Sequence, residues 1–262
     1  MGSDRASSRA FFGVSALLFA VSAAVTIAWG TSMSAMGMPM PGGWTMSMAW
    51  MRMPGQTWPG AAASFIGMWA VMMVAMMLPA LVPMLRRYRR AVAGTGETRL
   101  DGLTALVGVG YFFVWTVLGL AAYLLGVALA AVEMRRPALA RAVPIAAGVI
   151  VLIAGAHQLT AWKARHLACC REAPGRGRML PADPRTAWRH GLRLGLHCVQ
   201  CCAGLMLIVL VIGLMDLRTM ALVAVAVTVE RLAPAGERVA RAIGAVLVGA
   251  GVFLIVRAAG LG

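Results

Sequence analysis

The chain has 262 residues, of which 61% are hydrophobic and 13% are charged, whereas soluble domains carry about 25% charged residues. This composition excludes an ordinary soluble protein. Apolar runs as long as a bilayer-spanning helix exclude a membrane β-barrel, which would show short alternating segments. The net charge of +15 does not indicate nucleic-acid binding, because the basic residues cluster in the loops between apolar runs.

The apolar runs predict an all-α fold, a polytopic transmembrane bundle of about seven helices without a large soluble domain, with six helices as the alternative. In chain order the runs cover residues 11–29, 61–85, 103–132, 143–162, 195–215, 219–232 and 239–256. The sixth run would be about 21 Å long as a helix, which predicts a partial span. The first is longer than the apolar region of a signal peptide, so we expect an uncleaved helix. Residues 1–262 are expected to form one membrane domain.

Lys and Arg are distributed unevenly among the predicted loops. They precede the first run, follow the second at 86–99, fill a predicted loop at 163–193 and flank the last run at 231–241. Loops rich in Lys and Arg stay in the cytoplasm. We therefore predict a bacterial inner-membrane protein with a cytoplasmic N-terminus, and the Arg135-Arg136 pair on the outer side is the exception.

Residues 31–60 form a segment rich in Met, Gly, Pro and Trp, which the predicted topology places outside the membrane. Its candidate ligands are Met33, Met36, Met38, Met40, Met46 and Met48. A segment of this composition does not easily form a packed core, so its thioethers are available to bind metal. Thioether sulfur is a soft ligand that suits Cu(I). The alternative is an adaptable apolar surface, in which Met only fills space.

A second group of methionines lies within the second apolar run, just before Pro79: Met72, Met73, Met76 and Met77. Helical spacing places Met72 and Met76 on one face and Met73 and Met77 on another. Packing in lipid explains them equally well, because Met is simply apolar there. The functional alternative is a sulfur-lined route through the bilayer, and Pro79 is expected to bend the helix beside it.

All five cysteines and all four histidines fall between residues 157 and 202. The candidate metal ligands among them are His157, His166, Cys169, Cys170, His197, Cys198, Cys201 and Cys202, whereas His190 is expected to be a solvated loop residue. On a helix, Cys198, Cys201 and Cys202 share one arc. In the reducing cytoplasm such thiols bind metal or do redox chemistry rather than form structural disulfides. The types of ligand indicate Cu(I), with zinc as the alternative.

Two other interpretations of the cysteines remain open. Free cysteines also occur as small buried hydrophobic residues. Cys198-Val-Gln-Cys201 is a C-x-x-C sequence near the predicted start of the fifth helix, where a redox thiol would be activated. The sequence shows no Walker-type glycine loop, and its acidic residues lie near the ends of the predicted spans, so a buried proton relay is not expected. Glu230 and Arg231 are interpreted as charges at the end of a helix.

Three stretches resemble a bacterial family of integral membrane proteins that are predicted to bind metal. They are MWAVMMVAMMLP at 68–79, GAHQLTAWK at 155–163 leading to Cys170-Arg171, and HCVQCCAGLM at 197–206 with Met215-Asp216 beyond. The resemblance covers residues 68 to about 232 and implies a multi-pass membrane protein with a metal site. This chain has His166 where the family tends to have Cys, Gln200 where Gly is frequent, and Ala203 where Trp is frequent. The first difference puts an all-thiolate site in doubt.

The combined prediction is a copper-handling membrane protein that delivers or transports Cu(I) for cuproprotein supply or homeostasis. Its expected partners are the lipid bilayer and a cuproenzyme or metallochaperone, with no nucleic acid, and its oligomeric state is open. The alternatives are a membrane thiol–disulfide oxidoreductase and a structural subunit of a membrane complex. A non-enzymatic role is favoured over an enzymatic one.

Overall fold

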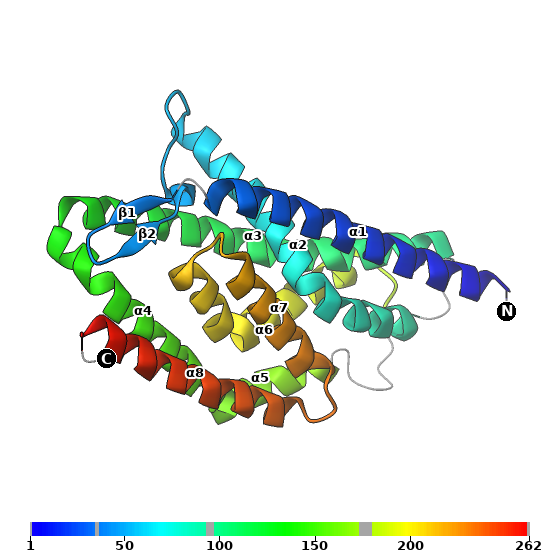
Figure 1. The fold of residues 1–262 in the computed structure, drawn as a ribbon. Coiled ribbons are helices and arrows are strands. Elements are labelled where there is room, and N and C mark those ends of the chain that lie inside the picture. Colours follow the sequence, from blue (N-terminus) through cyan, green and yellow to red (C-terminus); the bar gives the residue numbers. More distant parts are fainter. Residues whose placement is uncertain (1, 35–36, 93–96, 173–179, 261–262) are drawn as a thin grey trace.

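The structure is a computed structural model that describes residues 2–34, 37–92, 97–172 and 180–260. Within these ranges it consists of helices and one short hairpin (Figure 1). The elements are α1 Gly2–Ser34, β1 Met38–Met40, β2 Trp44–Met46, the 3-10 turn η1 Met48–Trp50, α2 Trp58–Ala91, α3 Glu97–Arg135, α4 Pro137–Gln158, α5 Ala161–Glu172, α6 Pro184–Ile212, α7 Leu217–Leu232 and α8 Gly236–Ala258. The all-α prediction is confirmed.

Six of the described helices, α1, α2, α3, α4, α6 and α8, are long and apolar enough to cross a membrane. This agrees with the alternative count of six spans. The sixth apolar run forms α7, which has only 16 residues, so it is too short for a full span, as predicted. The predicted cytoplasmic loop at 163–193 differs from the structure, because most of its described residues belong to α5 and to the first turns of α6.

Helices α2 and α6 form the centre of the bundle. Half of the apolar window of each is buried inside the protein, compared with 11–28% for the other four long helices. Both begin at a hydrogen-bonded N-cap, Thr57 for α2 and Asp183 for α6, with proline at one of the first two helical positions. Hydrogen bonds from Thr186 also lower the pKa of Asp183. The two helices that carry the methionine and cysteine motifs are therefore the two most enclosed.

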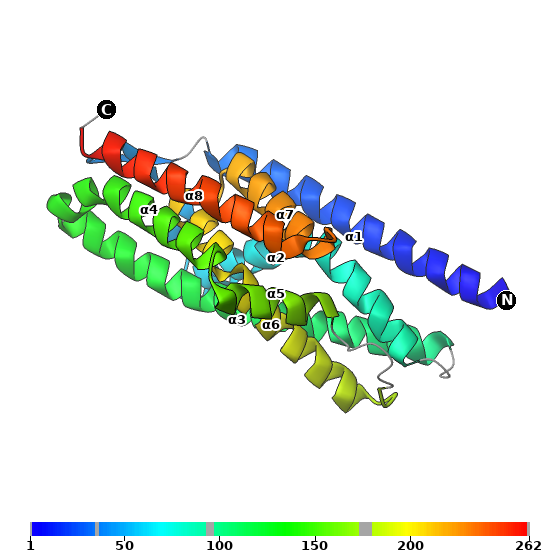
Figure 2. The same cartoon turned by 90° about the horizontal axis from the view of Figure 1, so that it is seen from below.

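The outer helices approach α6 and each other through glycine. Helices α4 and α8 lie side by side in both views (Figures 1 and 2). A Cβ atom on Gly155 of α4 would lie 2.7 Å from the backbone nitrogen of Val248 in α8. On α6, a Cβ on Gly191 would lie 2.4 Å from the carbonyl oxygen of Val107 in α3. Such small residues let helix backbones come close together in membrane proteins.

The methionine-rich segment is not a loop throughout, because β1 and β2 pair as an antiparallel hairpin with Met38 opposite Met46. We call residues 38–46 the methionine hairpin. The indole nitrogen of Trp44 donates a hydrogen bond of 2.8 Å to the carbonyl of Ala140 at the start of α4. Figure 1 shows the hairpin lying along the bundle near α3 and α4. The hairpin therefore lies at the end of the bundle where α4 begins.

Candidate metal centre

Four cysteine sulfurs from α5 and α6 lie together inside the bundle, and we call them the sulfur cluster. The Sγ atoms of Cys170 and Cys201 are 3.5 Å apart, those of Cys201 and Cys202 are 3.5 Å apart, and those of Cys198 and Cys202 are 4.0 Å apart. All four side chains are buried. All five cysteines, including Cys169, are free thiols, and Cys169 is exposed.

Local sequence explains how the cluster forms. Spacings of three and four residues place Cys198, Cys201 and Cys202 on the face of α6 that is directed into the bundle. Helix α5 packs against α6 and brings Cys170 to the same place. The hydrogen bond between its sulfur and Cys201, together with burial, raises the pKa of the Cys170 thiol well above its usual value. These surroundings favour the thiol form of Cys170.

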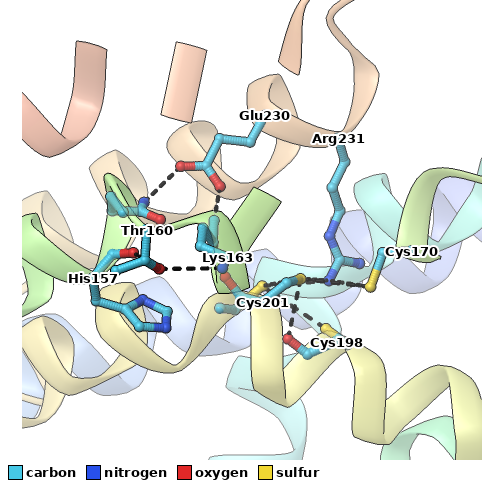
Figure 3. Close-up of polar contacts among 10 residues, drawn as sticks. His157, Thr160, Lys163, Cys170, Cys198, Cys201, Glu230 and Arg231 are labelled. Atoms are coloured by element: carbon cyan, nitrogen blue, oxygen red, sulfur yellow. Dashed lines mark hydrogen bonds and ion pairs between the residues drawn. The ribbon is translucent and has the colours of Figure 1, made fainter. Parts of the chain in front are cut away.

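The guanidinium of Arg231, from the C-terminal end of α7, lies among the sulfurs (Figure 3). Its Nη2 atom is 3.0 Å from the Sγ of Cys201, 3.3 Å from that of Cys202 and 3.9 Å from that of Cys170. No three His, Cys, Asp or Glu side chains in the described residues enclose a metal ion in this arrangement. In this arrangement the guanidinium of Arg231, rather than a metal ion, lies among the sulfurs.

A buried polar network lies beside the cluster. Glu230 accepts hydrogen bonds from Lys163 at 2.7 Å and from the amide of Gln158 at 2.6 Å, and all three side chains are buried. Lys163 also donates a hydrogen bond to the backbone carbonyl of Cys201. Glu230 and Arg231 do lie in the last turn of α7, as interpreted, but both are buried and they point to different partners (Figure 3). In the sequence, the feature that could have indicated this network is a Glu-Arg pair at the end of an apolar run.

Tyr111 of α3 is a further neighbour that the sequence analysis did not identify. Its hydroxyl lies 2.9 Å from the Sγ of Cys198, and its side chain is fully buried. Tyr111 belongs to a long apolar run in which nothing distinguishes it from other packing residues. Only the pairing of α3 with α6, through glycines, brings its hydroxyl to the cluster.

The histidines form a group of their own rather than joining the sulfurs. Trp162 contacts the rings of His157 and His166, and the rings of His166 and His197 are 6.4 Å apart. The Nδ1 atom of His166 pairs with the backbone carbonyl of Trp162. Across the described part of the chain, neither a hydrogen bond nor a ring contact links these imidazoles to the cluster. His190 stacks on Tyr88 and is not a solvated loop residue.

The methionines of α2 belong to the same continuous core as the sulfur cluster. Met72, Met73, Met76 and Met77 are all buried, and this core also includes Met206 of α6. In the methionine-rich segment, Met46 is buried. Four others are only partly buried: Met33, Met38, Met40 and Met48. Met36 lies outside the described residues. The structure therefore places the two methionine groups in different environments.

The residue types of the sulfur cluster suit a soft metal, although in the described residues no three of these side chains are arranged to hold one. Two sulfurs bound to one ion at about 2.3 Å lie roughly 3.8 Å apart in tetrahedral geometry, and the three observed separations differ from this by a few tenths of an ångström. Thiolates select Cu(I) and zinc over hard cations.

The fold and this centre define an α-helical protein with six apolar helices and a buried group of free thiols. The chain belongs to the PpoB2 family, described as a copper chaperone, whose model matches residues 66–254. No curated protein and no solved structure matches it. The resemblance to a metal-binding family is thus confirmed as membership of a copper-related family. The matched range includes the sulfur cluster and Arg231 but not the methionine hairpin.

Proposed function

We propose that this protein is a Cu(I) carrier of the bacterial inner membrane, which binds copper at the sulfur cluster and passes it to a cuproprotein. The observation that carries the proposal is the group of four buried thiols around one guanidinium, in a chain of a copper chaperone family. Copper is the cargo in this role. A buried site protects Cu(I) from water and from oxidants, and it requires a partner or a movement for release.

Charge balance explains the position of Arg231. Binding Cu(I) to thiols releases their protons. Two thiolates and one Cu(I) carry a net charge of −1, and the neighbouring guanidinium brings the total to zero. A neutral group is far less costly than a charged one inside a low-dielectric bundle. In this proposal, Arg231 moves away from the sulfurs when copper binds. Its positive charge then compensates for the negative charge of the copper–thiolate complex.

The methionines supply a path for the metal. In the proposed orientation, the methionine hairpin lies on the outer side and α2 runs from there to the arginines of the inner side. The buried methionines of α2 share one core with the sulfur cluster. Thioethers bind Cu(I) weakly enough for exchange, because they carry no charge. We propose that copper passes between the hairpin and the cluster along this line.

The test is the copper content of the detergent-purified protein after loading with Cu(I) under reducing conditions. We expect stoichiometric copper in the wild type and loss of most of it in a Cys170→Ser/Cys201→Ser/Cys202→Ser variant. The matched control is Cys169→Ser, because Cys169 is adjacent in sequence but exposed. A variant with Met38, Met40, Met46 and Met48 changed to Leu is expected to keep the cluster's copper but to load more slowly. Retention of copper by the triple cysteine variant would refute the assignment.

The thiol–disulfide oxidoreductase hypothesis has less support. A C-x-x-C sequence gains reactivity at the start of a helix, but α6 begins at Pro184, so Cys198 lies well inside it. The expected position near a helix start was therefore wrong. Mixed-disulfide trapping with Cys201→Ser distinguishes the two functions, since a copper carrier forms no such adduct during its cycle.

A further inference from the structure

A cavity of about 360 Å³ lies behind the sulfur cluster, where α2, α5, α7 and the start of α8 meet. Arginines from three different helices contribute to its wall: Arg87 of α2, Arg171 of α5 and Arg231 of α7. One acidic residue, Glu237, also lines it. The remaining lining residues are Ala80, Pro83, Met84, Leu167, Ala168, Leu232 and Pro234. We call this space the arginine cavity.

The positive charge of the arginine cavity is not neutralised within the described residues. None of its three arginines forms a salt bridge there. The one lining carboxylate, Glu237, lies 3.9 Å from Arg241 instead. Guanidinium groups that line one cavity repel one another, and a bound anion would reduce that repulsion.

Two of the three arginines are held in place. Arg171 donates hydrogen bonds to the backbone carbonyls of Ala233 at 2.5 Å and Pro234 at 3.1 Å, which directs the side chain along this wall. Arg231 is buried, and its Nε and Nη1 atoms have no hydrogen-bond partner in the described part of the chain. Buried donors without partners are rare and indicate a ligand, a water or a movement that supplies one. A cavity lined by the same residue provides the space for such a ligand.

We propose that the arginine cavity binds a phosphate-bearing anion. The planar guanidinium fork matches the oxygens of a phosphate group in two parallel hydrogen bonds. Basic pockets between membrane helices on the cytoplasmic side accept lipid headgroups, so the phosphate comes either from an anionic phospholipid or from a free phosphate compound. This inference does not depend on copper binding.

The experiment measures phosphate binding to copper-free protein. Wild-type protein in neutral detergent is offered phosphatidylglycerol or phosphatidylcholine, and retained lipid is counted by native mass spectrometry. In a second arm, inorganic phosphate is titrated against the delipidated protein and the melting temperature is recorded. We expect retention of phosphatidylglycerol over phosphatidylcholine if the source is a lipid. A phosphate-dependent rise in melting temperature instead indicates a free anion.

The test variant is Arg87→Gln/Arg171→Gln, for which we expect binding to weaken by at least about tenfold, the size typical of lost charged hydrogen bonds. Arg87→Gln alone is a second variant, because Arg171 also binds backbone and its loss could disturb the fold. The matched control is Arg86→Gln, since Arg86 neighbours Arg87 but contacts Phe12 rather than the cavity. Binding of neither ligand, or an equal loss in the Arg86→Gln control, would overturn the proposal.

Discussion

Two adjacent residues, Glu230 and Arg231, show how much chemistry the end of one short helix contributes. Glu230 completes a buried ion pair with Lys163, and Arg231 places its charge among the sulfurs. Buried charges of this kind persist only when they are paired or hydrogen-bonded. Lys163 also binds the carbonyl of Cys201, so the ion pair connects α5, α6 and α7 at the position of the cluster.

Lys163→Met is expected to destabilise the protein by about 3–5 kcal/mol, because it leaves Glu230 buried without its cation. Replacing both partners, as Lys163→Met/Glu230→Leu, should recover much of that loss. The exposed Glu237–Arg241 pair is the control, and Arg241→Met should change stability by less than about 0.5 kcal/mol. Unfolding midpoints in detergent measure all three, and an equal effect of the two single variants would contradict the role of the buried pair.

At the scale of elements, the approach of helices through glycine decides which side chains meet. Helix α4 lies against α8 at Gly155, and α6 lies against α3 at Gly191. The contact between α6 and α3 brings Tyr111 to Cys198. The contact between α4 and α8 holds α4, the helix that carries His157 and Gln158. A methyl group at either glycine would separate the helix backbones.

Gly155→Ala is therefore expected to lower stability by about 1–3 kcal/mol, the usual cost of overpacking. Gly249→Ala provides the control on α8, since a Cβ there meets no atom within 4 Å. This change should leave stability equal or slightly higher, because alanine favours helix. Thermal unfolding of both variants measures the difference, and equal midpoints would show that α4 and α8 can separate without cost.

At the scale of the whole molecule, the methionine hairpin and the arginine cavity lie at opposite ends of the long helices. Helix α2 has 34 residues, about 51 Å as a helix, with the hairpin segment before its start and Arg87 near its end. Figures 1 and 2 show α8 running back toward the hairpin end, where the C-terminus lies. In the proposed orientation the hairpin end is outside and the cavity end faces the cytoplasm.

Labelling with a membrane-impermeant maleimide tests this orientation. In a Cys169→Ser background the other four cysteines are buried, so an introduced thiol reports alone. We expect Met53→Cys to react in intact cells and Arg238→Cys to react only after lysis. Both positions are exposed, which makes them a matched pair. The reverse pattern would place the N-terminus outside.

The sequence by itself determined the all-helical class, most of the long apolar helices and the residue types of the candidate metal centre. Periodicity and length suffice for these, because a span needs about 20 apolar residues and i, i+3, i+4 spacing gathers Cys198, Cys201 and Cys202 on one face. The choice of copper also follows from the chemistry of sulfur, and the family agrees with it.

Only the tertiary structure decided which of these residues meet. It joined Cys170 to the α6 thiols, left Cys169 exposed and separated the histidines from the sulfurs. It also placed Arg231, Glu230 and Tyr111 at the centre, although they are distant from the cysteines in sequence, and it paired Lys163 with Glu230. Helix packing sets these contacts through the close approach of glycines and the pairing of buried charges, which join residues that are far apart in the chain.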